Sequence, residues 1–299
     1  MRQRSHRLGR LFMLAVVIAG AVVVLRYLAS EAVLPFQGQA VGVVEVRGVI
    51  RDAEDVVAAL KRFRTSERIG AVVLRVDSPG GAVAPAQEIY SEVARLGETK
   101  SVVASLGSMA ASGGYYVASA SHSIVANPGT LTGSIGVIMA VRSVEELAHR
   151  AGIKETVVKS GPYKDMANPL RSLEPEEEAI LQGAVNDVHA QFVAAVAAGR
   201  HMTEEDVRKL ADGRLYSGAQ ALEIGLVDYL GSYEEALRIA ADAAGIEGEP
   251  RTIRARTERW PWWADLLGRV VGVRVSDWLS GGMPGGLLFL YPGGDIDFR

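Results

Sequence analysis

A serine with small neighbours is the first feature of this sequence that could do chemistry. Ser112 lies in the stretch MAASGGYY, preceded by two alanines and followed by Gly113 and Gly114. Small neighbours leave room for a second molecule to reach the hydroxyl, but they also allow a helix to pack closely against a sheet. A serine hydroxyl is a weak nucleophile and needs a base within hydrogen-bond distance. Ser112 is therefore a candidate nucleophile whose base must come from elsewhere in the chain.

Histidine is the usual base for a serine nucleophile, and the chain contains five. None of them lies in a glycine-rich loop, so we interpret each as a surface or core side chain. They are His6, His122, His149, His189 and His201.

A lysine can also act as the base, provided that burial in an apolar pocket lowers its pKa enough for it to lose its proton. Lys164 lies in KSGPYKDMANP (159–169), a loop constrained by one glycine and two prolines. From the residues alone, Lys164 is either this base or an ordinary solvated charge. We interpret Lys159, at the start of the same loop, as a structural or exposed charged group.

Acyl transfer also requires N–H donors for the negatively charged oxygen of the tetrahedral intermediate. The turn DSPGGAVAPA (77–86) follows a strand-like run and precedes a helical one, so Gly80 and Gly81 can present backbone N–H groups at the carboxyl edge of a sheet. Gly113, directly after the serine, is the second candidate donor. An ordinary strand-to-helix turn is the alternative for the glycine pair, and the sequence does not distinguish Gly80 from Gly81.

Composition excludes several other kinds of function. The 299 residues include 35 acidic and 32 basic ones, a net charge of −3, so no nucleic-acid surface is expected. The absence of cysteine excludes disulfides, thiolate metal sites and a cysteine nucleophile. No His/Asp/Glu cluster has ligand spacing and no GxxxxGK[ST] loop is present, so we expect neither a metal nor another cofactor.

The first residues are typical of a membrane anchor. Residues 1–10 form a basic flank with four arginines and no acid, and residues 11–25 carry no charge. A span usually needs about 20 residues, but Arg26 can snorkel and residues 27–29 can extend the helix into the interface. The positive-inside rule predicts a single-pass anchor over 11–28 in the cell (inner) membrane, with the N-terminus cytoplasmic, the body extracytoplasmic and a linker over 29–40. A cleaved signal peptide is the alternative.

Beyond residue 40, strand-like and helix-like patterns alternate, which predicts an α/β fold with a mostly parallel sheet in a domain over 41–250. The C-terminal extension, 251–299, contains all four tryptophans and is expected to contact another subunit or the membrane. The predicted strands are 41–50, 71–78, 101–106, 122–128 and 155–161, and the predicted helices are 52–63, 85–97, 112–120, 143–152, 174–200, 203–213, 218–231 and 232–245.

Four motifs in this order resemble the signal peptide peptidase A family: SPGG, ASGGYY, TLTGSIGVI (130–138) and PYKD. Its members are membrane-anchored serine peptidases with a Ser-Lys dyad and a ClpP/crotonase-like fold. The resemblance covers about residues 40–245 and includes RLYSGAQALEIGLVD (214–228), which is similar to the helix motif that closes this fold. We therefore expect repeated β-β-α and βαβ units and a helical C-terminal extension.

The resemblance implies a role for each motif. Ser112 would be the nucleophile that forms an acyl-enzyme, and Lys164 the general base. Ser134, in TGSIG, would orient the lysine amine. Gly80 or Gly81, together with Gly113, would form the oxyanion hole.

The resemblance also implies substrates and partners. Members of the family bind short apolar peptides, so remnant signal peptides are the expected substrates. The single catalytic module is similar to the short form of the family, whose members assemble as homo-oligomeric rings. Three alternatives remain: a related Ser-Lys membrane protease of the SohB or stomatin-operon type, an inactive membrane scaffold on the same fold, and a crotonase-type acyl-CoA enzyme.

Overall fold

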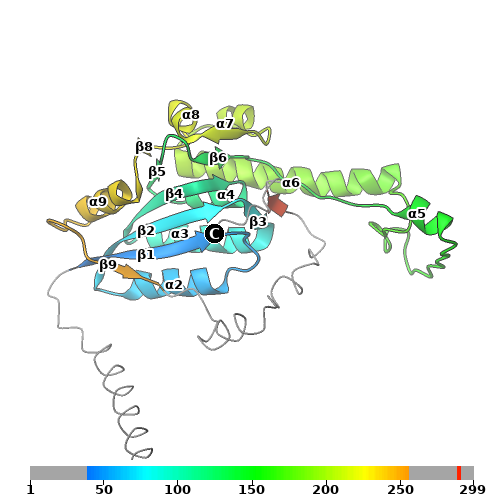
Figure 1. Ribbon diagram of the computed structural model, residues 1–299, viewed down its shortest axis with the longest axis horizontal. Coiled ribbons are helices and arrows are strands. Elements are labelled where there is room, and N and C mark those ends of the chain that lie inside the picture. Colours follow the sequence, from blue (N-terminus) through cyan, green and yellow to red (C-terminus); the bar gives the residue numbers. More distant parts are fainter. Residues whose placement is uncertain (1–38, 256–287, 291–299) are drawn as a thin grey trace, which may run out of the picture. The chain divides into compact units, whose positions relative to one another are not determined.

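A central sheet with helices on both faces organises the chain (Figure 1). The computed structural model describes residues 39–255 and the backbone of residues 288–290. The strands are β1 (Ala40–Arg47), β2 (Ile69–Ser78), β3 (Gly80–Ala82), β4 (Ser101–Ala111), β5 (Ser123–Ala126), β6 (Leu131–Gly133), β7 (Leu215–Ser217), β8 (Tyr229–Leu230), β9 (Thr252–Arg254) and β10 (Leu288–Leu290). The helices are α2 (Glu54–Thr65), α3 (Val83–Gly97), α4 (Gly113–Ala118), α5 (Glu145–Arg150), α6 (Pro175–Arg200), α7 (Glu204–Leu210), α8 (Gly218–Glu223) and α9 (Tyr233–Ala243).

The sheet is mostly parallel. Its main path within the described residues runs β7-β6-β4-β2-β1-β9, with β5 and β8 joined on beside β4. The pairs β1–β2, β2–β4 and β4–β6 are parallel, whereas β6–β7 is antiparallel. Parallel strands require crossover connections, which the helices provide. The predicted α/β fold with a mostly parallel sheet is confirmed.

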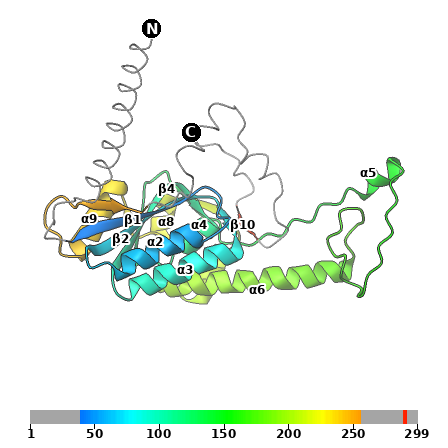
Figure 2. The same cartoon turned by 90° about the horizontal axis from the view of Figure 1, so that it is seen from below.

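The central strands are buried on both faces, which explains their continuous apolar runs. In β2, Val72 and Leu74 join the core formed with α2, α3, α4 and α6, while Ala71 and Val73 face the smaller core formed with α9. The alternation follows from the two-residue period of a strand. Figure 2 shows α2 and α3 lying side by side over one face of the sheet.

One predicted strand and the extent of two helices are wrong. Residues 155–161, predicted as a strand, form none, and the side chain of Val158 is 96% exposed. This segment belongs to an arm, residues 139–174, that lies with the start of α6 away from the sheet (Figures 1 and 2). A β-branched run without a neighbouring strand has nothing to pair with. The predicted helices 143–152 and 218–231 shorten to α5 and α8, since Gly225 at φ +78° terminates α8 and β8 follows.

Some predicted segments lie outside the described residues. These are the basic flank (1–10), the anchor (11–28), nearly all of the linker, and the tryptophans of the C-terminal extension. Among the residues that the structure does describe, no helix combines the length and apolar character needed to cross a membrane.

The C-terminal half of α6 packs on the end of α4. Phe192 lies edge-on to Tyr116, with ring centroids 5.0 Å apart. At Gly199, an added Cβ would lie 1.9 Å from the carbonyl oxygen of Ser119, whereas a Cβ at Gly183, in the same helix, would meet nothing within 4 Å. Glycine is therefore required at one of these two positions and not at the other.

We expect Gly199→Ala to lower the free energy of unfolding by about 2–3 kcal/mol, because the new methyl group must push α6 away from α4. Gly183→Ala is the matched control and should raise it by up to about 1 kcal/mol, since alanine favours the helix. Urea denaturation of both variants measures the difference. Equal stabilities would contradict the close approach of α6 and α4.

Candidate active site

Ser112 lies at the sharp turn from β4 into α4. Its backbone has φ 52° and ψ −119°, a region that residues with side chains rarely adopt. Its N–H donates to the carbonyl oxygen of Gly133 at 2.8 Å, and its own carbonyl accepts from the N–H of Tyr116 at 2.8 Å. Only 1% of the serine is exposed. The conformation is that of a side chain held at a strand-to-helix elbow.

The structure places Ser112 and Ser134 at the same end of two paired strands. In the parallel pairing of β4 and β6, Ala110 is opposite Thr132 and Ala111 is opposite Gly133, and the two serines directly follow this last pair. Ser134 is also at positive φ, 51°, and its N–H donates to the carbonyl oxygen of Arg214. The Ser112 hydroxyl is 3.5 Å from the carbonyl oxygen of Gly136. Both motif serines thus lie at one end of the sheet.

The SPGG turn is held against the start of α4. The Ser78 hydroxyl donates to the carbonyl oxygen of Gly48 at 2.6 Å and accepts from the Gly80 N–H at 3.1 Å. A Cβ at Gly114 would lie 2.7 Å from the carbonyl oxygen of Ser78. Because of this close contact, Gly113 and the SPGG turn lie next to each other. It also shows that part of the small-residue run around Ser112 is needed for packing.

The local structure requires glycine at both positions of the turn. Gly80 has φ +102°, and a Cβ at Gly81 would lie 2.0 Å from the carbonyl oxygen of Ile50. Ile50 donates to the Gly80 carbonyl and accepts from the Ala82 N–H. Because successive N–H groups of a strand point to opposite sides, the Gly81 N–H points away from Ile50. The Gly80 N–H is thus engaged by Ser78, whereas the Gly81 N–H points toward the opposite edge of β3.

The edge of β3 accepts an extended chain. β10 pairs antiparallel with β3, with Phe289 opposite Gly81 and Leu290 opposite Gly80. The pairing lies on the side toward which the Gly81 N–H points. Antiparallel addition of a strand to an open edge is a common way to bind an extended peptide.

The structure does not bring Lys164 to Ser112 within one chain. Lys164 is exposed and belongs to the arm, residues 139–174, which lies away from the sheet (Figures 1 and 2). Its backbone N–H donates to the carbonyl oxygen of Gly161 at 3.3 Å, and no hydrogen bond or ion pair within the described residues engages its amine. The pairing of Ser112 with Lys164 needs a second chain or a rearrangement of the arm.

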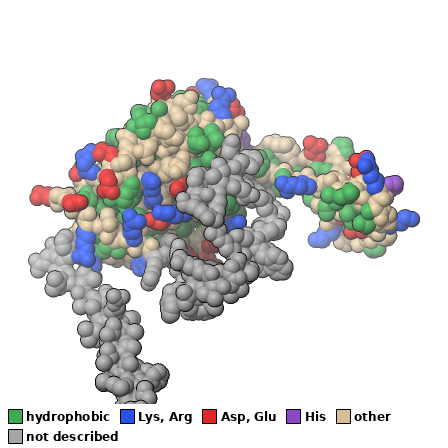
Figure 3. Space-filling model, viewed as in Figure 1, with side chains coloured by type: hydrophobic (Ala, Val, Ile, Leu, Met, Phe, Trp, Pro, Cys, Tyr) green, Lys and Arg blue, Asp and Glu red, His purple; other side chains and the backbone are tan. Residues whose placement is uncertain are grey.

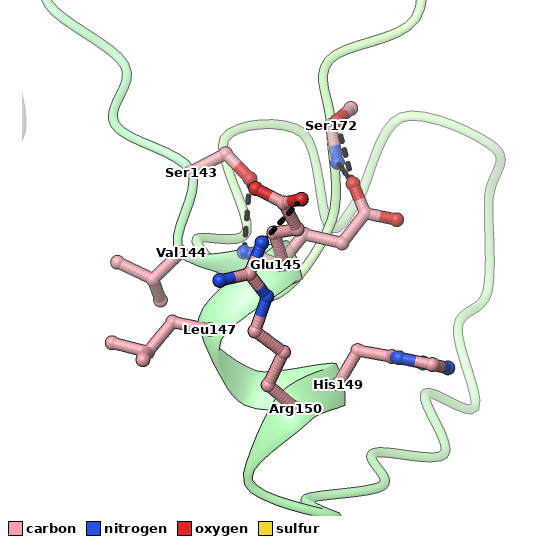
Figure 4. Close-up of a pocket in the computed structure, with 8 residues that line it drawn as sticks. Ser143, Val144, Glu145, Leu147, His149, Arg150 and Ser172 are labelled. Atoms are coloured by element: carbon pink, nitrogen blue, oxygen red, sulfur yellow. Dashed lines mark hydrogen bonds and ion pairs between the residues drawn. The ribbon is translucent and has the colours of Figure 1, made fainter.

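Hydrogen bonds attach α5 to the rest of the arm. Figure 4 shows the Glu145 carboxylate pointing toward Ser172, whose N–H and hydroxyl donate to it at 2.8 and 2.5 Å. These bonds lower the pKa of Glu145, so the carboxylate stays ionised. They join the beginning and the end of the arm.

The four histidines in the described residues have other surroundings. His122 accepts from the Val102 N–H at 3.1 Å through Nδ1, and Nε2 of His189 lies 3.0 Å from the carbonyl oxygen of Ala211. His149 lies on α5, and His201 ends α6 with φ 53°. No group of three metal-ligating side chains occurs in the described part of the chain.

Sequence reasoning missed Ser78, which fixes the glycine turn. Its side chain is buried and makes both of its hydrogen bonds to backbone groups of the turn region. The sequence does contain a signal for this role, because this serine is the first residue of SPGG. Tyr115, three residues after Ser112, is a second anchor, since its hydroxyl donates to the carbonyl oxygen of Leu226 at 2.8 Å.

We expect Ser112→Gly to be more stable than Ser112→Ala by about 1–2 kcal/mol, because glycine adopts positive φ without strain. Ser119 is the matched control: it is also buried but has φ −64°, so there the glycine variant should be the less stable one. Urea denaturation of the four variants tests this. An alanine variant at 112 that is as stable as the glycine variant would show that the elbow is unstrained.

Comparison with known proteins agrees with the motifs. Residues 94–247 match the model of Peptidase family S49. A Synechocystis protein named as a protease is 47% identical over 206 residues, covering 68% of this chain and 74% of that protein. An Enterococcus faecium protein named as a signal peptide peptidase SppA is 39% identical over 179 residues, covering 60% of this chain and 52% of that protein.

Among solved structures, a ClpP1 mutant from Listeria monocytogenes is similar, with a TM-score of 0.46 and 17% sequence identity, covering 65% of this chain and 94% of that one. The family match and the Synechocystis relative together identify the kind of enzyme. The chain belongs to peptidase family S49 and is a serine peptidase.

Proposed function

We propose that this peptidase is an endopeptidase that cleaves apolar peptides, remnant signal peptides among them, with Ser112 as nucleophile and Lys164 as general base. The strained elbow at Ser112 is the main support. It holds one hydroxyl next to Ser134 and next to the SPGG turn. The name of the Enterococcus faecium relative supports the choice of substrate.

The reaction has two halves. The neutral Lys164 amine takes the proton of Ser112 as Oγ attacks the peptide carbonyl carbon, and the resulting ammonium protonates the leaving amine. The acyl-enzyme is then hydrolysed by a water molecule that the same lysine activates. Ser134 orients the amine. The N–H groups of Gly81 and Gly113 stabilise the oxyanion, a contribution of about 3 kcal/mol for each well-placed donor.

The substrate binds as an added strand. The edge of β3, which pairs with β10 in this structure, lies next to Ser112, and a substrate strand that pairs there takes the place of β10. Backbone pairing accepts many sequences, so side-chain preference comes from the surroundings of the serine, where small residues precede it. This mode of binding favours extended peptides over folded proteins.

Subunits of a homo-oligomeric ring complete the site. Lys164 is exposed on the arm, and Figure 3 shows hydrophobic side chains gathered at that end of the chain. Exposed apolar surface of this kind marks a contact with another chain. The arm of one subunit therefore brings its lysine to Ser112 of a neighbour. The exposed apolar side chains of the arm include Val144, Leu147, Ile153, Val157, Val158 and Tyr163.

We expect Ser112→Ala and Lys164→Ala each to lose about a thousandfold or more in kcat/KM on an apolar signal-peptide fragment, because each removes a reacting group. Mixing the two inactive variants should restore a measurable fraction of activity, since some sites then combine an intact serine with an intact lysine. Lys154→Ala, on the same arm, is the control and should stay active. Cleavage of a fluorogenic peptide measures all of these.

Other results would overturn parts of this proposal. A fully active Lys164→Ala variant would show that Lys164 is not the base. If the mixed variants stay inactive although the oligomers are intact, the active site is not shared between subunits. If Ser112 also resists a serine-reactive phosphonate in an inactive wild-type chain, the scaffold interpretation replaces the enzyme. Cleavage of intact membrane proteins in preference to peptides would favour the SohB or stomatin-operon type.

We also propose that residues 11–28 anchor the chain in the inner membrane, with the catalytic domain extracytoplasmic. The full chain should sediment with membranes, resist alkaline carbonate and require detergent for release, because an apolar helix stays in lipid. A chain that starts at residue 39 is the control and should stay in the supernatant. A carbonate-soluble full chain whose mass shows loss of the N-terminal segment would instead indicate a cleaved signal peptide.

A further inference from the structure

The residue that follows Lys164 is an acid, which is an unfavourable neighbour for a lysine base. A carboxylate close to an amine favours the ammonium form, and only the neutral amine can accept a proton. In the structure, however, the Asp165 carboxylate is engaged by two other cations. Lys159 Nζ lies 2.6 Å from Oδ1, and the Arg171 guanidinium contacts Oδ1 and Oδ2 at 3.0 and 3.2 Å.

These contacts have an electrostatic consequence for Asp165. Hydrogen bonds from Arg171 and Lys159 lower the pKa of its carboxyl group to about 2, so it is ionised at neutral pH. The negative charge of Asp165 is neutralised by the adjacent cations of Arg171 and Lys159.

Arg171 also attaches the lysine loop to α6. Its guanidinium donates to both oxygens of Glu177, at 2.5 and 2.7 Å, and to the Asp165 carbonyl oxygen at 3.2 Å. Glu177 is 3% exposed and its carboxylate also accepts from the Glu174 N–H, as part of the capping box of α6. The loop is thus fixed to the first turn of the longest helix.

Lys159 closes the loop on the other side of Lys164. Its amine donates to the Pro162 carbonyl oxygen at 2.8 Å as well as to Asp165. The chain is therefore held two residues before Lys164 and one residue after it. The Lys164 amine is left without a hydrogen bond or ion pair in the described part of the chain.

We propose that Arg171 is a positioning residue for Lys164: it holds the Asp165 carboxylate away from the lysine amine and fixes the lysine loop to α6. The inference rests on the proposed role of Lys164 as base. The opposite arrangement, with Asp165 paired to Lys164, would hold the amine as an ammonium ion.

The other charged groups around this loop are already engaged. Tyr163 faces Glu176 of α6, whose charge raises the pKa of the tyrosine. Glu155 accepts from the side chain of Asn168 at 2.6 Å. Replacing Arg171 therefore leaves Glu177 without its arginine and Asp165 with Lys159 as its one remaining cation among the described residues, and Asp165 is the one adjacent in sequence to Lys164.

The test measures the protonation of Lys164 directly, in the full chain with Ser112→Ala to prevent turnover. The pH dependence of acetylation of the Lys164 amine by acetic anhydride, read by mass spectrometry, gives a midpoint. Arg171→Gln should raise that midpoint by about one pH unit, because the freed carboxylate stabilises the ammonium form. Arg171→Gln combined with Asp165→Asn should return it to the wild-type value, and Arg171→Lys should leave it nearly unchanged.

Activity is then read in the same variants with Ser112 present. Arg171→Gln should lower kcat/KM at pH 7 by about tenfold and move the half-maximal rate to higher pH by the same shift as the labelling midpoint. Arg150→Gln is the matched control, since Arg150 lies on the same arm and pairs only with Glu146 among the described residues. It should change neither quantity.

The outcomes separate this inference from the proposed function. A labelling midpoint that is the same in Arg171→Gln and wild type overturns the inference, even if activity falls, because the arginine is then only structural. A shifted midpoint together with a fully active Lys164→Ala variant supports the effect of Arg171 on Lys164 and overturns only the role of that lysine as base.

Discussion

The strained backbone at Ser112 is the constraint on which the arrangement of the site depends. A non-glycine residue at φ 52° costs about 1–3 kcal/mol and persists only where the surroundings leave no alternative. Here the surroundings are the Gly133 carbonyl that accepts from the Ser112 N–H, and α4 packed against the SPGG turn. The strands behind the elbow are buried on both faces. A rigid sheet can hold such strain, whereas a surface loop would relax.

The site and the arm follow different physical rules. Around Ser112, position is set by backbone hydrogen bonds, close packing and glycines that no other residue can replace. In the arm, it is set by ion pairs among exposed or half-buried groups, with apolar side chains left facing outward. Pairs of that kind are individually weak but directional. The first kind of structure buries its side chains within one chain, and the second kind leaves apolar side chains exposed.

Much of the fold could be predicted from the sequence, because its strands and helices carry strong patterns. The β-branched runs of β1 and β2 and the acid-rich first turn of α6 are local signals with local causes. The adjacency of Ser112 and Ser134 was predictable only through family resemblance, since it depends on the register of β4 against β6. The prediction of a strand over 155–161 was wrong for the converse reason. Its pattern is that of a strand, but pairing is a property of neighbours, which a local sequence does not specify.

The length of α6 has a mechanical consequence. Its 26 residues extend about 39 Å at 1.5 Å per residue. One end packs on the helix that begins after Ser112, and the other end carries Glu177, to which the lysine loop is fixed. A tilt of only about 5° at the packed end would displace the far end by about 3 Å, the length of a hydrogen bond. The packing of Phe192 and Gly199 at one end of α6 therefore limits how far the lysine loop at the other end can move.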